Sequence, residues 1–439
     1  MEDVGYVVNP NSVAVIGGGY AGIAAAVKLA ELGVKCVVFE SAKVLGGRAR
    51  KVEYRDTTLD NGQHILSGAY TELLRMMALV GVPASAFQRV PLRLDMGENF
   101  SLRAPNLPAP FHLAYALLAA KGLNWHERFA AIRLIQSLKK SRFNVDPNQT
   151  VAELLAAHQQ PQNLIDFLWQ PLTVSALNTP IETASAQVLA NVLRDTLAAS
   201  RAASDLILPK TDLTALFPAP AAQWLAKHGS SVRLTSKIGS ITASSVGFDI
   251  ATGGELISFQ SVILAVGPHQ LSTMELPIAA PAPMQYEPIY TVYLQYPPQV
   301  KLRLPMIGCT EKLTQWFFDR GQLSQINGLI VAVISASGTH EALDHAALAM
   351  RVHAELEEIA GTLPAFIWHK VVAEKFATFA CTPAAQNTLR PATTTDVAGL
   401  FLAGDYVACD YPGTLEAAVR NGVAAAELSA KFISKSSHD

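Results

Sequence analysis

The stretch SVAVIGGGYAGIAAAVKLAELGVKCVVFE, residues 12–40, decides the fold of this chain. It opens with an apolar, β-branched run that ends in glycine, as a buried parallel strand does. A glycine-rich turn follows, then apolar residues at helical spacing up to Gly33, and then a second apolar run ending at Glu40. This order predicts a strand–helix–strand unit and therefore an α/β fold.

The turn carries the spacing G-x-G-x-x-G at Gly17, Gly19 and Gly22. In that pattern the first glycine permits a tight turn, the second lets the backbone approach a pyrophosphate, and the third lets the helix pack close to the strand. The helix N-terminus then offers free N–H groups to the phosphates. Glu40 is placed to accept hydrogen bonds from ribose hydroxyls, and its charge disfavours the 2′-phosphate of NADP.

The next segment favours FAD over NAD. Gly46, Gly47 and Arg48 follow Glu40 closely, where an NAD dehydrogenase has no need of them. A guanidinium beside two flexible glycines suits a second contact to pyrophosphate, although a surface turn with a solvated arginine is the alternative. The polar sequence DNGQH, residues 60–64, can by itself also be an Asn-Gly hairpin turn.

Composition excludes several classes of protein. The chain has 439 residues, enough for two or three domains, and no run of 18 uncharged apolar residues that would predict a membrane-spanning helix. A net charge of −2 argues against a nucleic-acid partner. The four cysteines lack CxxC spacing, and the first residues lack the pattern of an export signal. We therefore expect a cytoplasmic protein with reduced thiols and no metal site.

The motifs at the two ends of the chain together resemble the flavin-containing amine oxidase and phytoene desaturase superfamily. They are VIGGGYAG, FE, LGGRAR and DNGQH near the N-terminus, and LFLAGDY and YPGTLEAAVRNG near the C-terminus. The resemblance implies an α/β fold (α+β overall) with a Rossmann-type FAD-binding domain and a discontinuous substrate-binding domain. The expected FAD-binding domain comprises residues 1–75, 205–270 and 388–439, and the expected substrate domain comprises residues 76–204 and 271–387.

The same resemblance implies how FAD is held, without a covalent bond. Asp405 would bind the ribityl–pyrophosphate region, and Gly404 would allow close approach. A helix beginning at residues 414–416 would point its N–H groups at the pyrimidine side of the flavin, where the reduced form carries negative charge. Ile238 would contact the adenine edge through its backbone. The full expected set is Gly17, Gly19, Gly22, Glu40, Gly47, Arg48, Gly62, Gln63, His64, Ile238, Gly404, Asp405, Thr414, Leu415 and Glu416.

Three central segments, residues 169–197, 204–225 and 315–321, narrow the resemblance to the squalene-associated FAD-dependent desaturases, the hydroxysqualene dehydroxylases of hopanoid synthesis. This implies that an apolar C30 isoprenoid, hydroxysqualene, is reduced to squalene, with hydride from a flavin that an unidentified reductant has reduced. Alternatives with the same fold are a carotenoid- or squalene-type desaturase, which transfers hydride in the opposite direction, an amine oxidase, and a prenyl-lipid-binding protein without flavin.

The residues themselves agree with a lipid substrate. Residues 167–191 contain a single formal charge, Glu182, and residues 288–296 alternate Tyr290, Val292, Leu294 and Tyr296 on one strand face, as a tunnel wall or a core would. Residues 111–118 predict a short apolar helix, suited either to peripheral membrane contact or to the core. The candidates for the acid that protonates the leaving hydroxyl are His64, Asp410 and Tyr411.

Overall fold

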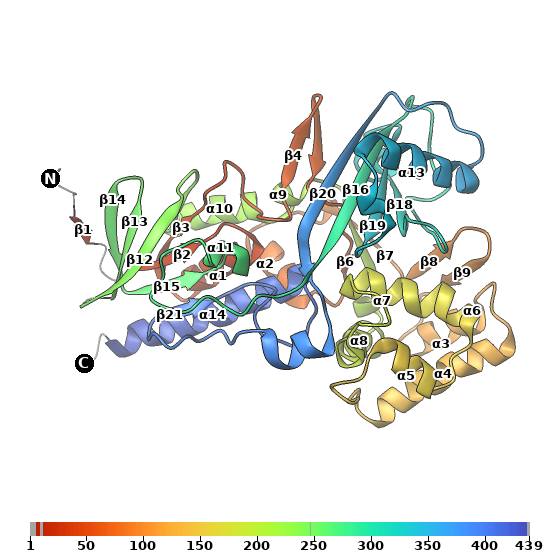
Figure 1. Ribbon diagram of the computed structural model, residues 1–439, viewed down its shortest axis with the longest axis horizontal. Helices are drawn as coiled ribbons and strands as arrows, with labels where there is room; N and C mark the ends of the chain where they lie inside the picture. Colours follow the sequence, from red (N-terminus) through yellow and green to blue (C-terminus); the bar gives the residue numbers. More distant parts are fainter. Residues whose placement is uncertain (1–5, 9–11, 246, 437–439) are drawn as a thin grey trace.

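The computed structural model describes residues 6–8, 12–245 and 247–436. Residues 1–5 and 9–11, which form most of the segment considered for an export signal, lie outside the described residues. Both ends of the described chain lie in the same part of the molecule, and a larger part built on a second sheet lies beside it (Figure 1). Among the helices of the described residues, none is long and apolar enough to cross a membrane.

The first part is built on a parallel sheet of five strands in the order β11-β3-β2-β15-β21. The predicted strand–helix–strand unit is its centre, with β2 (Ser12–Ile16), α1 (Tyr20–Glu31) and β3 (Lys35–Phe39). The other strands are β11 (Ser231–Arg233), β15 (Ser261–Leu264) and β21 (Leu400–Leu402). The expectation of an α/β fold is therefore confirmed, and strands from opposite ends of the chain share one sheet.

Helices and a smaller sheet complete this part. Helix α14 (Leu415–Ser436) packs against α1, and a Cβ at Gly422 would lie 2.2 Å from the carbonyl oxygen of Ala21, so only glycine permits this approach. Helices α2 (Thr71–Leu79), α9 (Leu213–Leu216), α10 (Pro218–Lys227) and α11 (Pro268–Leu271) lie around it. The smaller sheet has the order β1-β14-β13-β12, with bounds Tyr6–Val8, Glu255–Phe259, Gly247–Thr252 and Ile238–Ser244.

The hairpin of β4 (Lys51–Tyr54) and β5 (Thr57–Asp60) leads from the first part toward the second. Its turn is made by Arg55 and Asp56, both with positive φ. The sequence DNGQH begins at the last residue of β5 and is not the turn of the hairpin, so the Asn-Gly hairpin alternative is wrong.

The second part is built on a sheet of seven strands in the order β20-β16-β19-β18-β17-β8-β9. Two long antiparallel strands, β16 (Tyr286–Gln295) and β20 (Trp368–Phe379), run from this sheet back to the first part (Figure 1). The remaining strands are β19 (Leu329–Ser335), β18 (Trp316–Asp319), β17 (Met306–Gly308), β8 (Arg93–Met96) and β9 (Phe100–Arg103).

Helices flank this sheet, and a small three-stranded sheet adjoins it. The short helix α12 (Arg320–Ser324) follows β18 directly. The other helices form one group: α3 (Phe111–Leu118), α4 (Trp125–Lys140), α5 (Val151–Ala157), α6 (Gln162–Leu164), α7 (Gln170–Leu177) and α8 (Ala186–Leu193). The small sheet has the order β6-β10-β7, with bounds Leu66–Ser67, Leu206–Pro209 and Phe87–Val90. The helix expected at residues 111–118 is present, whereas the domain boundaries stay a prediction.

Helix α13 (His345–Ala360) covers one face of β16. Tyr290, Val292, Leu294 and Tyr296 belong to the same buried cluster as the apolar residues of α13. The alternating face noted in the sequence is thus core, and it does not form a tunnel wall.

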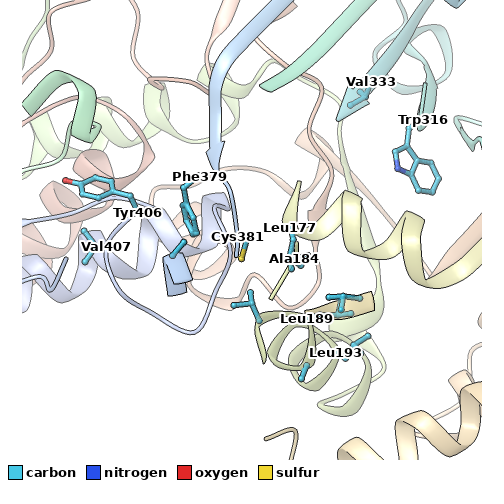
Figure 2. Close-up of a cluster of buried hydrophobic side chains, with 14 of the residues drawn as sticks. Leu177, Ala184, Leu189, Leu193, Trp316, Val333, Phe379, Cys381, Tyr406 and Val407 are labelled. Carbon is cyan, nitrogen blue, oxygen red and sulfur yellow. The ribbon is translucent and has the colours of Figure 1, made fainter. Parts of the chain in front are cut away.

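An apolar cluster connects the two parts. Figure 2 shows it reaching from Tyr406 and Val407, through Phe379 and Cys381, to Leu177 and Leu189. These residues come from α7, α8, β20 and the C-terminal loop. The two parts therefore share one continuous apolar core.

A buried ion pair fixes the start of the DNGQH segment. The Asp60 carboxylate lies 3.4 Å from Nη1 of Arg320, and each side chain is at most 4% exposed. Asp60 also accepts the backbone N–H of Leu213 at 2.8 Å, and Nη1 of Arg320 donates to Oε1 of Gln63. Burial raises the pKa of Asp60 to about 6, an effect that the charge of Arg320 opposes.

We expect Arg320→Ala to lower the free energy of unfolding by about 3–5 kcal/mol, because it leaves the Asp60 charge buried without its partner. Denaturant unfolding of flavin-saturated protein measures this difference. Lys51→Ala is the control, since its ion pair with Glu53 is exposed on both sides and its loss should leave the free energy of unfolding nearly unchanged. Equal stability of the two variants would contradict a structural role for the buried pair.

Candidate active site

The main cavity has a volume of about 810 Å³ and lies where the carboxyl ends of the parallel strands face the second part. Open α/β sheets bind ligands at this edge. Its lining comes from widely separated parts of the chain, with residues from 16–21, 39–50, 61–65, 175–178, 236–238, 265–274, 374–378, 404–406 and 413–415. The cavity therefore exists only when both ends of the chain have folded together.

The glycine-rich turn forms one wall of the cavity. Gly19 pairs with Gly46 as an isolated bridge, and Gly46 N–H donates to the Gly18 carbonyl oxygen at 2.9 Å. A Cβ at Gly19 would meet only backbone atoms of Gly47, the nearer at 3.8 Å. A side chain at Gly19 would therefore fill the space in front of these glycines, which we call the glycine cradle. Gly19 is also the N-cap of α1 and has no side-chain cap, which leaves the first helical N–H groups for a phosphate.

Gly22 lies behind this wall and outside the cavity lining. A Cβ at Gly22 would lie 1.9 Å from the carbonyl oxygen of Gly17. Its position thus allows α1 to pack closely on the turn, as the motif predicts, while the other two glycines of the motif line the cavity.

Glu40 lies at the cavity with its carboxylate partly engaged. One oxygen accepts the N–H of Gly18 at 2.7 Å, and the other accepts the N–H of Ala42 at 2.7 Å. Ile238 lines the same end of the cavity. The carboxylate therefore fixes the glycine turn, and its remaining lone pairs can accept ribose hydroxyls.

Arg48 and Asp405 form an ion pair across the cavity at 2.5 Å. Asp405 is 8% exposed on its side chain, and Arg48 also donates to the carbonyl oxygens of Phe376 and Ala377. The alternative of a solvated surface arginine is thus wrong. A guanidinium in this place can contact pyrophosphate while it stays paired with Asp405.

The C-terminal loop is shaped by Arg390, which the sequence did not single out. Its guanidinium donates to the backbone carbonyl oxygens of Asp405, Val407, Cys409 and Tyr411. An arginine 15 residues before Asp405 carries no spacing signal of its own. Its role depends on the loop that folds around it.

Helix α14 begins at the other end of the cavity. Thr414 and Leu415 line it, and the Thr414 hydroxyl accepts the N–H of Ala417 at 3.2 Å. Nearby, the Tyr406 hydroxyl is buried with no partner among the described residues, although Tyr406 lines the cavity. A buried hydroxyl without a partner indicates a missing ligand. The glycine cradle, the uncapped N-terminus of α1 and this hydroxyl fit a dinucleotide with a polar second ring system, as FAD has.

His64, Gly62 and Gln63 line the cavity as well. Nδ1 of His64 lies 2.7 Å from the Gly62 carbonyl oxygen, which can only accept, so Nδ1 carries the proton. Burial lowers the pKa of His64 below its ordinary value, so that the ring is neutral at pH 7. In that state Nε2 is an acceptor, and only the protonated ring can donate from Nε2.

Besides Gly22, three expected residues lie outside the lining: Asp410, Tyr411 and Glu416. The buried Glu416 carboxylate accepts the N–H groups of Glu72 and Leu73, at the first turn of α2. Asp410 is 69% exposed and lies 3.7 Å from Arg194. Tyr411 lines a second, smaller cavity and donates to Asp195 at 2.9 Å.

The wall opposite the glycine turn comes from the second part and is apolar. Ile289, Trp316, Phe318 and Val333 line it. Trp316 lies in a segment that carried the family resemblance, but strand periodicity alone does not show which of its faces meets the cavity. Figure 2 places Trp316 and Val333 next to each other at one end of the shared core.

Comparison with known proteins agrees with this arrangement. The chain is 30% identical over 95% of its length to the hydroxysqualene dehydroxylase of Sinorhizobium fredii and covers 98% of that protein. It is 28% identical over 95% of its length to the hydroxysqualene dehydroxylase of Rhodopseudomonas palustris, again covering 98%. A putative protoporphyrinogen oxidase from Exiguobacterium, 14% identical, has the same fold, with a TM-score of 0.69 and coverage of 96% of this chain and 99% of that one.

The model of the flavin containing amine oxidoreductases matches residues 20–428, nearly the whole chain. This match and the similarity to the Sinorhizobium enzyme agree with a cavity built for a dinucleotide. The chain is an FAD-dependent oxidoreductase and belongs to the flavin containing amine oxidoreductase family, in its hydroxysqualene dehydroxylase branch.

Proposed function

We propose that this protein reduces hydroxysqualene to squalene. The observation that carries the proposal is the similarity to curated hydroxysqualene dehydroxylases over 95% of the chain. When bound, reduced FAD supplies the hydride that replaces the hydroxyl, which leaves with a proton as water. A separate electron donor must then reduce the flavin again.

The lining of the cavity supports an orientation for FAD. The glycine cradle and Arg48 would hold the pyrophosphate, while Glu40 and Ile238 would hold the adenosine end. The α14 N-terminus at Thr414 would then lie at the flavin ring, where its dipole favours negative charge. No covalent link is needed, because these contacts reach along the whole cofactor.

We expect Gly19→Val to abolish flavin retention in a folded protein. The backbone at Gly19 has φ of −74°, which valine adopts without strain, and the new side chain would occupy the phosphate cradle. Absorbance at 450 nm after gel filtration measures flavin content, and acid precipitation of the wild type should release it. Gly239→Val is the control, since its Cβ points into open space. Normal flavin content in Gly19→Val would exclude this turn as the phosphate site.

We propose His64 as the acid that protonates the leaving hydroxyl. Its ring lines the cavity, and Nε2 can donate only when the ring is protonated. Because burial lowers the pKa of His64, the reactive form is scarce at pH 7 and becomes more abundant as the pH falls. Tyr411 is the competing donor, and burial raises the pKa of its hydroxyl to about 12, so it keeps its proton throughout.

Photoreduced protein mixed anaerobically with hydroxysqualene should return to oxidised flavin and form squalene. We expect this rate to fall as the pH rises from 5 to 8, and to fall about 10²–10⁴-fold in His64→Phe. Stopped-flow absorbance and product analysis measure both. If the reoxidation rate does not depend on pH and falls only in Tyr411→Phe, the acid is Tyr411. Conversion of squalene to a more unsaturated product by the oxidised enzyme would contradict the proposed direction.

We propose that the protein docks on an anionic membrane surface through α3 and α4. Exposed apolar side chains of these helices, together with Leu107 just before α3, form the docking patch: Leu107, Phe111, Tyr115, Leu118, Trp125 and Phe129. Phe111 and Trp125 are 64% and 61% exposed. Residues 101–142 also contain seven Lys or Arg and one acid, Glu127, which is buried, although the whole chain carries −2. Apolar side chains within a basic rim suit a bilayer with anionic headgroups.

We expect Phe111→Glu/Tyr115→Glu to lose flotation with phosphatidylglycerol vesicles while keeping its flavin. Wild-type binding should weaken as salt rises, because part of the attraction is electrostatic. The control Met350→Glu/Ile367→Glu changes two exposed apolar residues outside the patch and should float normally. A wild type that never floats would mean that the apolar substrate arrives by another route.

A further inference from the structure

A second cavity of about 180 Å³ lies beside the first and shares part of its lining. Six residues line both cavities and form a neck between them: Ile65, Tyr70, Ser175, Ala176, Trp316 and Thr414. At this neck Nε1 of Trp316 donates to the Ser175 hydroxyl at 2.8 Å, which fixes the indole ring. Figure 2 shows this ring beside the end of the shared core.

The neck lies at the reactive end of the cofactor, if FAD is oriented as proposed above. Thr414 belongs to it, directly precedes α14 and accepts the N–H of Ala417 in the first turn of that helix. A molecule that extended from the flavin ring through the neck would therefore enter the second cavity. The cavity is positioned to hold the part of a substrate next to its reacting carbon.

The walls of the second cavity are those of a hydrocarbon site. Beyond the neck they are mostly aliphatic, with Leu66, Leu92, Leu94, Met96, Leu172, Val192, Leu197, Leu206 and Met306. The one carboxylate, Asp195, is already bound by Arg194 at 2.7 Å and by the Tyr411 hydroxyl at 2.9 Å. Because the one lining carboxylate is already paired, burying a charged ligand group here is costly, whereas an alkyl chain fits the aliphatic wall.

The far end of this cavity approaches the docking patch from inside. Ser204 lines the cavity, and its hydroxyl lies 3.1 Å from Nε2 of His112. His112 is on the buried side of α3, the helix that exposes Phe111 and Tyr115. The two apolar features thus lie on opposite sides of one short helix.

We propose that the second cavity binds one hydrocarbon arm of the isoprenoid substrate and that the neck at Ser175 and Trp316 determines which carbon lies at the flavin. This deepens the proposed function and rests on it for the identity of the chain. Free squalene serves as the probe for the cavity, because its binding does not depend on turnover or on the direction of the reaction.

Val192→Phe fills the cavity from α8, and Leu92→Trp fills it from the opposite wall in case the first variant does not fold. We expect each to weaken squalene binding at least about tenfold, a loss of 1.4 kcal/mol, with flavin content unchanged. Partition of squalene from cyclodextrin into the holoenzyme measures the affinity. Ile367→Trp adds similar bulk at an exposed site that is 63% accessible, and it should bind squalene normally.

A second measurement separates this inference from the proposed reaction. Reduced protein is mixed with hydroxysqualene or with geraniol, a short allylic alcohol that does not need the second cavity. Val192→Phe should slow flavin reoxidation by the long alcohol alone. If neither alcohol reoxidises the flavin of the reduced wild type, the proposed reaction is wrong. The squalene-binding measurement still tests the cavity in that case. Unchanged squalene affinity in both filled variants would overturn the inference.

Discussion

The ion pair between Arg48 and Asp405 is the contact on which the rest of the structure depends. It joins residues that are 357 positions apart, and the same guanidinium binds two carbonyl oxygens on β20. One side chain therefore connects the glycine-rich N-terminal segment, the C-terminal loop and the strand that leads to the second sheet. The hydrogen bonds between the Arg48 guanidinium and the Asp405 carboxylate are charge-assisted, and such bonds are stronger than those between neutral groups. The cavity for the dinucleotide is the space around this connection.

This arrangement couples cofactor binding to folding. The parallel sheet needs β21 from the C-terminal end beside β15 and β2, so the sheet is incomplete until a long loop has closed. A ligand that contacts both chain ends binds only the closed form and stabilises it by mass action. The two long strands β16 and β20 and the apolar cluster of Figure 2 extend this coupling to the substrate side.

Several residues that look like ligand contacts are occupied by the chain itself. Glu40 holds Gly18, Gln63 holds Arg320, and the Glu416 carboxylate caps α2. This is expected of a buried polar group, which must find a partner in the protein. Groups without such partners are then more informative, and the Tyr406 hydroxyl is one of them. The N-terminus of α1, which has no side-chain cap, adds to it, and together they indicate where the cofactor lies.

The sequence by itself determined the strand–helix–strand unit, the short helix at residues 111–118 and the family. Local spacing specifies these features, because periodicity reports which face of an element is apolar and glycines report where the backbone must turn. It could not determine which partner each face meets. The alternating residues of β16 proved to be core under α13, while Ile289 on the other face lines the cavity. Only the tertiary structure showed that His64 holds its proton on Nδ1 and that Arg390 shapes the C-terminal loop. It also showed that a second apolar cavity lies behind Trp316. The physical reason is distance along the chain. The groups that bind a side chain or line a cavity come from segments far apart in the sequence, and no local pattern shows which of these segments meet.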